Sequence, residues 1–144
     1  MVYNIEGVFI ALYGVASFWM VAVIWFVQIV HYPLFLNVKS DHITYFTQHQ
    51  TLISWIVLPA MLLEAVSLVL LWSEYKNNTL FIISVILLVL IWISTFFIQV
   101  PIHQHLTQNP NQELIIKLIK SNWIRTFLWT IKFITITLLI KENL

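Results

Sequence analysis

Side chains able to do acid–base chemistry recur at set places in an otherwise apolar chain of 144 residues. Three histidines flank long apolar runs: His31 follows the first, His49 precedes the second and His103 follows the third. Histidine titrates nearest to neutral pH, so it can serve as a base, an acid or a metal ligand. Asn122 and Arg125 open the fourth run and could stabilise an anion. These five residues are the candidate catalytic group.

Helical periodicity places further polar residues beside them. At about 100° per residue, residues three and four apart share a helix face. The shared faces join Gln28 with His31, Trp92 and Gln99 with His103, and Asn122 and Arg125 with Trp129. The candidate substrate-binding residues, chosen as polar or aromatic neighbours of the catalytic group, are Gln28, Tyr32, Gln99, Trp123 and Trp129.

A simpler interpretation of these residues is anchoring. Histidine, tryptophan, arginine and asparagine are ordinary at a membrane interface, where Trp123 and Arg125 could hold the start of a helix in place. Against it, Gln28 and Gln99 lie inside apolar runs, and a buried amide in lipid needs a partner.

Metal and haem sites remain open alternatives, and no cofactor is favoured. The sequence has no cysteine, which excludes thiolate catalysis, iron–sulfur clusters and sulfur-ligated zinc. A di-iron bundle needs histidine three residues after glutamate, whereas Ser67 follows Glu64 at that spacing. A single zinc, copper or iron ion could use His31, His49 and His103, although no spacing enforces it. Haem could place a propionate on Arg125, but the only glycines, Gly7 and Gly14, lie at the other end.

Glu64 is predicted to lie apart from this group. It follows His49 by 15 residues, which is about 22 Å along a helix. We expect either a protonated carboxyl hydrogen-bonded to a neighbouring helix or a proton carrier near the far end.

Composition defines the elements that must position these residues. The chain is 60% hydrophobic and 9% charged, with a mean hydropathy of +0.90, far outside the range of soluble domains. Four apolar segments are long enough to cross a bilayer: 8–30, 52–71, 80–100 and 123–140. We therefore predict an all-α integral membrane protein, a single transmembrane domain over 1–144 folded as an up-down-up-down four-helix bundle. Both termini then lie on one side of the membrane, and the candidate site lies at the opposite end.

The helices are predicted to continue beyond the hydrocarbon near 31–51 and 101–122. Asn109 before Pro110 has the pattern of an N-cap followed by proline at the first helical position. The fourth segment carries Arg125 and Lys132, which can turn inward or reach the interface.

A short internal repeat accompanies the polar residues. The segments Phe26-Val27-Gln28-Ile29 and Phe97-Ile98-Gln99-Val100 share a pattern, and proline and histidine follow each within a few residues. This favours a parallel duplication about an axis along the membrane normal. In such a bundle Gln28 would face Gln99 across the core.

Two further segments resemble a known family. The sequences VPIHQHL at Val100–Leu106 and NWIRTFLW at Asn122–Trp129, in a four-span chain of this length, are similar to the anthrone oxygenase-like family of small membrane proteins. The resemblance implies oxidation of a lipid-soluble phenolic compound by oxygen without a dedicated cofactor. Members often carry asparagine after the proline motif, whereas Ile102 and His103 follow Pro101 here.

Two functions follow from these observations. The first is a membrane oxidoreductase or oxygenase that acts on a hydrophobic aromatic or quinol-like substrate, with histidine as base, Arg125 and Asn122 as donors and tryptophans as walls. The second is a non-enzymatic transporter or accessory subunit whose polar stripe holds helices together. The expected partners are the lipid bilayer, a small hydrophobic substrate and a second copy in a homo-oligomer, in a multi-pass location such as a bacterial inner membrane. Nucleic acid is excluded by the near-neutral charge.

Overall fold

Four long helices make up the protein. The computed structural model describes residues 5–38 and 41–142, and these contain helices and no strand. The first and the third contain short π or 3-10 turns, and the second and fourth are continuous. The bounds are α1 (Ile5–Phe26), η1 (Val27–His31), α2 (Tyr32–Leu34), η2 (Phe35–Asn37), α3 (His42–Tyr75), α4 (Thr79–Ser94), η3 (Thr95–Gln99), α5 (Val100–Gln108) and α6 (Gln112–Glu142). All four long helices are long and apolar enough to cross a membrane, the charged fourth included. The predicted all-α architecture with four such helices is confirmed.

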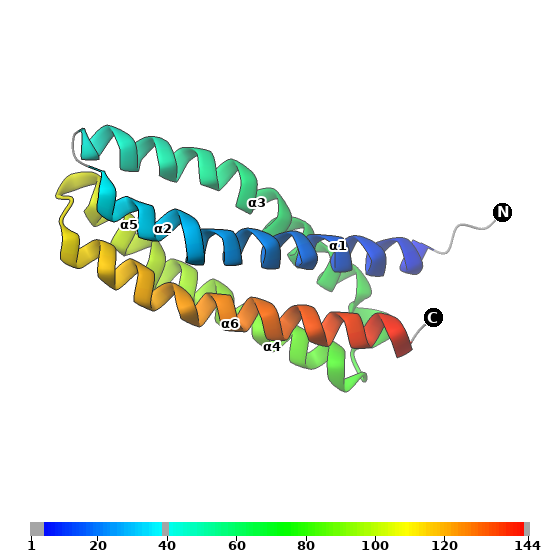
Figure 1. The fold of residues 1–144 in the computed structure, drawn as a ribbon. Coiled ribbons are helices and arrows are strands. Elements are labelled where there is room, and N and C mark those ends of the chain that lie inside the picture. Colours follow the sequence, from blue (N-terminus) through cyan, green and yellow to red (C-terminus); the bar gives the residue numbers. More distant parts are fainter. Residues whose placement is uncertain (1–4, 39–40, 143–144) are drawn as a thin grey trace.

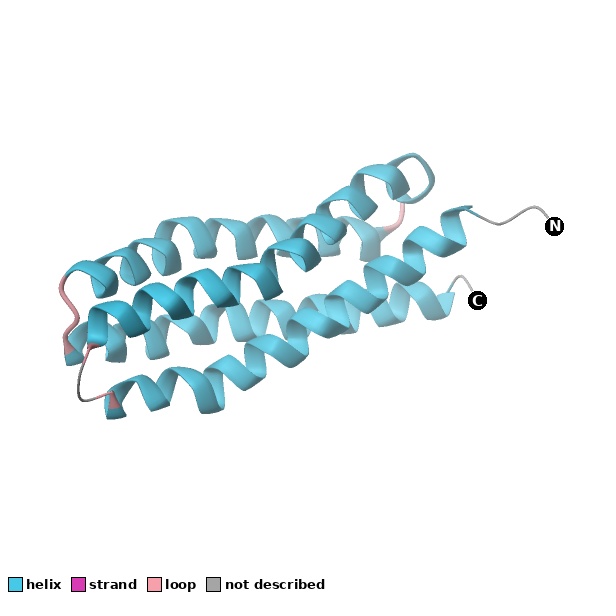
Figure 2. Ribbon diagram, turned by 90° about the horizontal axis from the view of Figure 1, so that it is seen from above, coloured by secondary structure: helices cyan, strands magenta, loops and turns pink. Residues whose placement is uncertain are grey.

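Consecutive long helices run in opposite directions along one elongated bundle (Figure 1). Connections are confined to its two ends (Figure 2). The helix α1 packs closely against α3 and α6, and α4 packs against α6. By contrast α3 and α4 touch in few places, while α3 meets α5 near the end that carries the histidines. The bundle is therefore closed on three sides and open between α3 and α4.

The outward surface of the bundle is strongly apolar. Trp55, Val69 and Phe97 are each about three-quarters exposed, and many other large hydrophobic side chains face outward. Such a continuous apolar surface suits hydrocarbon rather than water. Polar side chains instead lie inside, among them Gln28, Gln99 and Asn122.

Two π-helical turns interrupt the first and third long helices. The turn η1 precedes Pro33 and the turn η3 precedes Pro101. Proline lacks a backbone N–H and crowds the preceding turn, so a wider turn before it relieves the helix. Turns of this kind hold one extra residue and are frequent at functional sites.

The two halves of the chain bury corresponding positions. Residues 71 apart are hydrogen-bonded to each other at two levels: the Tyr13 hydroxyl donates to Ser84 Oγ at 3.2 Å, and Tyr32 Oη lies 2.9 Å from His103 Nε2. The same offset relates other buried pairs, namely Ile10 and Phe81, Met20 and Ile91, Gln28 and Gln99, and Phe35 and Leu106. The short repeat in the sequence thus belongs to a longer correspondence between the first and third long helices.

The start of α6 differs from the prediction. The helix begins at Gln112, and Asn111 caps it, because Asn111 Oδ1 accepts a hydrogen bond from the Leu114 N–H at 2.8 Å. The predicted cap at Asn109 is wrong, since that residue closes α5 by donating its N–H to the His105 carbonyl. Pro110 lies in the connection rather than in the helix.

Candidate functional site

A chain of hydrogen bonds joins the first and fourth long helices at the end where the histidines lie. The Asn122 amide donates to Gln28 Oε1 at 2.8 Å, and the Gln28 amide donates to the Ile119 carbonyl at 3.2 Å. Arg125 donates from Nε to Asn122 Oδ1 at 3.0 Å. Asn122 and Gln28 are buried, so these contacts satisfy amides that would otherwise be costly inside the bundle. The amides hold the Arg125 guanidinium in one orientation.

The guanidinium leads to a tyrosine–histidine pair. Arg125 donates from an Nη nitrogen to Tyr32 Oη at 3.3 Å, and the same oxygen lies 2.9 Å from His103 Nε2. Arginine can only donate, so the tyrosine oxygen accepts from it and the hydroxyl proton is free to donate to His103 Nε2. Tyr32 thereby connects a fixed positive charge to a proton acceptor. We call Gln28, Tyr32, His103, Asn122 and Arg125 the polar network.

The π turn in the first long helix decides which residue joins this network. Regular α-helical spacing predicted that His31 shares a face with Gln28. Regular spacing also brings Tyr32, four residues after Gln28, near that face. The wider turn η1 rotates His31 away from it, so Tyr32 is buried and His31 is only half-buried. The inward role expected of His31 thus falls to its neighbour.

His31 forms a separate pair with the second long helix. His31 Nε2 lies 2.8 Å from His49 Nδ1, a hydrogen bond in which one ring must donate and the other accept. Both side chains line a groove of about 510 Å³ between α1 and α3, which we call the outer groove. The rings of His49 and His103 have centroids 5.6 Å apart, so the pair lies beside the polar network. His49 Nε2 is buried and has no hydrogen-bond partner among the described residues.

A cavity of about 150 Å³ opens inside the bundle against the polar network, and we call it the inner cavity. Its polar wall includes Tyr32, His103, Arg125 and Gln99. The rest of its lining is mainly apolar, including Trp129. The site therefore presents a few polar groups within a hydrophobic enclosure, which is typical of binding sites for small molecules.

Gln99 supplies an unused acceptor in this wall. Its side chain is 1% exposed, and its amide donates to Ser121 Oγ at 3.1 Å. Its carbonyl Oε1 is buried and has no hydrogen-bond partner in the part of the chain that the structure describes. A buried acceptor of this kind costs free energy unless a ligand or water donates to it. Gln99 meets α6 rather than the facing glutamine, so the predicted pairing of Gln28 with Gln99 is not made.

The structure distributes the predicted residues over three places. Those at the inner cavity or in the polar network are Gln28, Tyr32, Gln99, His103, Asn122, Arg125 and Trp129. His31 and His49 lie at the outer groove. Trp123 lies elsewhere, with its ring edge-on to Trp25 at 5.8 Å and stacked on Phe127.

The three histidines are not grouped as metal ligands in this structure. Among residues 5–38 and 41–142, no group of three or more histidines, aspartates or glutamates is arranged to hold an ion. His31 Nε2 and His49 Nδ1 bond to each other, and His103 Nε2 bonds to Tyr32, so the suggested set of His31, His49 and His103 stays a prediction.

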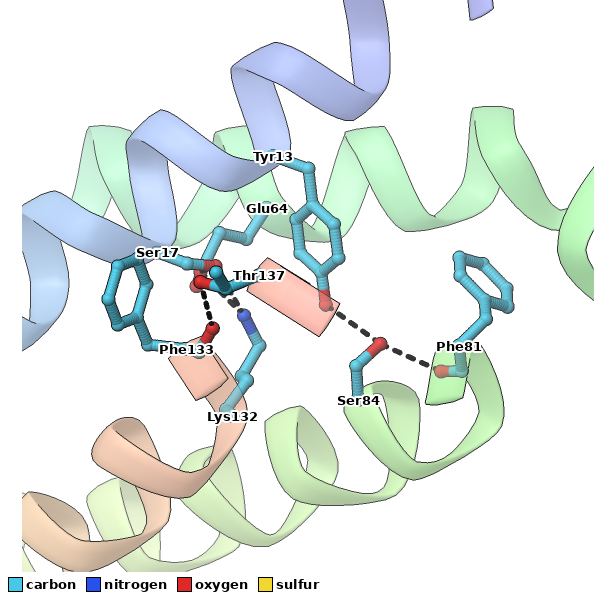
Figure 3. Close-up of polar contacts among 8 residues, drawn as sticks. All are labelled: Tyr13, Ser17, Glu64, Phe81, Ser84, Lys132, Phe133 and Thr137. Carbon is cyan, nitrogen blue, oxygen red and sulfur yellow. Dashed lines mark hydrogen bonds and ion pairs between the residues drawn. The ribbon is translucent and has the colours of Figure 1, made fainter. Parts of the chain in front are cut away.

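A second buried polar site was missed from the sequence. Glu64 on α3 pairs with Lys132 on α6 at 2.6 Å, and neither side chain is exposed. Lys132 Nζ also donates to Ser17 Oγ at 2.9 Å and lies 4.4 Å from the centre of the Tyr13 ring. Figure 3 shows these side chains converging from three helices, with Tyr13 directed onward to Ser84. The available signal was that each of two apolar segments contains an ionisable residue, because opposite charges inside a membrane tend to pair.

The expected hydrogen bond between Glu64 and a neighbouring helix is present, because Glu64 Oε1 accepts from Lys132 on α6 and from Ser17 on α1. The sequence did not indicate that the partner on α6 is a lysine. One carboxylate oxygen carries the contacts to Lys132 and Ser17, and the other oxygen has no hydrogen-bond partner among the described residues.

Comparison with known proteins adds no relative. No protein-family model, no curated protein and no solved structure matches this chain.

Proposed function

We propose that this chain is a multi-pass membrane protein whose inner cavity binds a hydroxylated aromatic ring and oxidises it with molecular oxygen. One observation carries the proposal: a proton acceptor, a guanidinium and an unpaired amide carbonyl meet in one apolar cavity. The continuous apolar surface of the four helices supports the membrane location.

Binding requires a group that donates a hydrogen bond. The Gln99 carbonyl is an acceptor in the cavity wall, so a substrate hydroxyl would satisfy it. The Trp129 indole and the other apolar walls would cover the ring, which favours an aromatic ligand over a polar one.

Proton removal would run through Tyr32. A substrate hydroxyl beside Tyr32 gives its proton to the tyrosine oxygen while the tyrosine proton passes to His103 Nε2. The product is a phenolate anion next to the Arg125 guanidinium, which stabilises the new negative charge. Asn122 and Gln28 act on this step indirectly, because they orient the guanidinium.

Electron removal completes the reaction. The electron-rich monoanion of a hydroquinone gives two electrons to oxygen. Its remaining hydroxyl proton and the proton taken up by His103 also pass to the reduced oxygen. Hydroquinone and oxygen are thereby converted to quinone and hydrogen peroxide. The polar network supplies the base and the charge stabilisation, and oxygen, which dissolves readily in apolar surroundings, is the oxidant.

The test measures oxygen consumption by the purified protein in lipid nanodiscs with methylhydroquinone. Tyr32→Phe removes a single oxygen atom and leaves the ring packing, so we expect kcat to fall by roughly 10²–10⁴-fold. The matched control is His105→Gln, because His105 is an exposed histidine two residues from His103 and lies outside the polar network. Its rate should equal that of the unmodified protein.

Two results would contradict the proposal. Equal oxygen consumption by the unmodified protein and Tyr32→Phe would exclude proton transfer through Tyr32. If a folded, monodisperse protein consumed no oxygen with any hydroquinone tried, the proposed oxidation would be excluded.

An accessory, non-enzymatic role is the second candidate, and a specific observation favours it. Gln28 bonds to Asn122 and to the Ile119 carbonyl of α6, and Asn122 also bonds to Arg125 on its own helix, as expected if these side chains served only to hold the bundle together. In that case Tyr32→Phe should lower the thermal stability of the protein and alter no oxygen-consuming activity.

A further inference from the structure

The opening between α3 and α4 breaks the correspondence between the two halves of the chain. The first long helix corresponds to the third and α3 corresponds to α6, so the contact between α1 and α6 has its counterpart between α4 and α3. The first contact is tight: Lys132 on α6 bonds to Ser17 on α1, and Trp25 donates to Thr130 at 3.0 Å. The second is a groove of about 580 Å³ lined mainly by apolar and aromatic side chains of α3, α4 and η3. We call it the lateral groove.

The lateral groove reaches the inner cavity at one residue. Phe96 in η3 lines both spaces, with the exposed groove on one side and the cavity on the other. Phe96 is half-exposed, and its ring has the Trp92 ring as a neighbour at 5.8 Å. A path from the apolar surface of the bundle to the polar network thus passes this side chain.

The size of the inner cavity limits what can be oxidised there. A dry cavity of about 150 Å³ accepts a molecule of benzene size, whereas sites for drug-sized ligands measure about 300–1,000 Å³. The inner cavity has the smaller volume. One six-membered ring fits, and the three fused rings of an anthrone do not.

Unpaired polar groups lie on both sides of Phe96. Gln99 lines the inner cavity, and its buried carbonyl has no hydrogen-bond partner in the described ranges. Trp92 lines the lateral groove, and its buried indole N–H also has none there. A hydroxyl of a ring in the inner cavity can donate to Gln99.

We infer that the substrate is a lipid quinol: a single hydroxylated ring held in the inner cavity, with an apolar chain that lies in the lateral groove and passes Phe96. This inference rests on the proposed function and adds the substrate class and its route. The groove suits the chain because it shares Phe96 with the cavity that holds the ring and offers an apolar tail a matching surface.

Two probes with the same ring test the role of the chain. Methylhydroquinone and its decyl-substituted form are titrated without oxygen into protein in phosphatidylcholine nanodiscs, and quenching of tryptophan fluorescence gives apparent Kd values without turnover. Val89→Trp places a large side chain in the lateral groove from α4. Displacing two or more methylene groups should weaken decyl binding about tenfold, while methylhydroquinone binding should stay unchanged.

The control and the second variant use the same substitution. Val15→Trp lies on the exposed face of α1, away from both spaces, and should leave both Kd values unchanged. Val69→Trp narrows the groove from α3 and should repeat the effect of Val89→Trp even if the latter folds poorly. Each probe partitions into the bilayer to the same extent with every variant, so the ratio of apparent Kd values between two variants reports binding to the protein.

The outcomes separate this inference from the proposed function. If Val89→Trp and Val69→Trp leave decyl binding unchanged and only displace co-purified phospholipid, the groove holds bilayer lipid and the inference is wrong. Rapid oxidation of anthrone, or oxidation of methylhydroquinone with no benefit from the chain, would also overturn the inference while the proposed function stands. Chain-dependent binding without oxidation of either hydroquinone would support the quinol site and overturn the proposed oxidation.

Discussion

Among individual residues, Arg125 has the most specific geometry. It donates from Nε to Asn122 and from an Nη nitrogen to Tyr32, so one planar group fixes an amide and a hydroxyl together. A lysine ammonium is a point charge on a flexible stem and cannot make both contacts in that geometry. The role of Arg125 therefore depends on its shape as much as on its charge.

Arg125→Lys should consequently reduce activity while the charge is kept. We expect kcat for methylhydroquinone to fall by roughly 10²–10³-fold, as for the loss of one donor at a developing anion, with a smaller change in KM. Lys117→Arg, on the exposed part of the same helix, is the control and should have no effect. A fully active Arg125→Lys protein would show that the planar guanidinium is not needed for activity.

The buried pair of Glu64 and Lys132 leads to a stability prediction. Removing one partner leaves an uncompensated buried charge, so Glu64→Gln and Lys132→Met should each lower the free energy of unfolding by about 3–5 kcal/mol. The double variant, which leaves no buried charge, should lie close to the unmodified protein. Unfolding in mixed micelles measures all four proteins, and additive losses in the double variant would argue against a direct interaction.

On the scale of helices, the π turns and the caps determine which residues reach the site. The turn η1 rotates His31 away while Tyr32 stays buried, and η3 ends at Gln99, which lines the inner cavity. Both turns precede a proline, so a local backbone constraint has a consequence for the side chains that line the cavity.

The cap of α6 can be tested in the same way. Asn111→Ala removes the acceptor for the Leu114 N–H and should cost about 0.5–2 kcal/mol of stability. Asn109→Ala keeps that hydrogen bond and should cost less. Thermal unfolding of both variants in one detergent gives the comparison, and a larger loss for Asn109→Ala would place the cap where the sequence pattern had suggested.

For the whole molecule, the antiparallel order predicts which connections share a side of the membrane. The protein has no cysteine, so single cysteines at Asn37, Asn77 and Asn111 can be labelled without background. In sealed proteoliposomes of uniform orientation, a membrane-impermeant maleimide should either label both Asn37→Cys and Asn111→Cys or label neither. Asn77→Cys should show the opposite result. Opposite labelling of positions 37 and 111 would rule out four spans.

The four apolar helices, and the end of the bundle at which most polar residues gather, could be predicted from the amino-acid sequence alone. Hydropathy is a local property that accumulates over about 20 residues, so each helix can be recognised without knowledge of its neighbours. The same local reasoning singled out Gln28, Gln99, His103, Asn122 and Arg125, because polar residues inside or beside apolar runs are conspicuous.

How those residues are used depends on the tertiary structure. Regular periodicity places both His31 and Tyr32 near the face of Gln28, and it could not anticipate the π turn that rotates His31 away, because that turn departs from the period on which the prediction depends. The pairing of Glu64 with Lys132 depends on the depth and rotation of two helices far apart in the chain. The opening between α3 and α4 likewise depends on packing angles, which are set by the contacts of all four helices together.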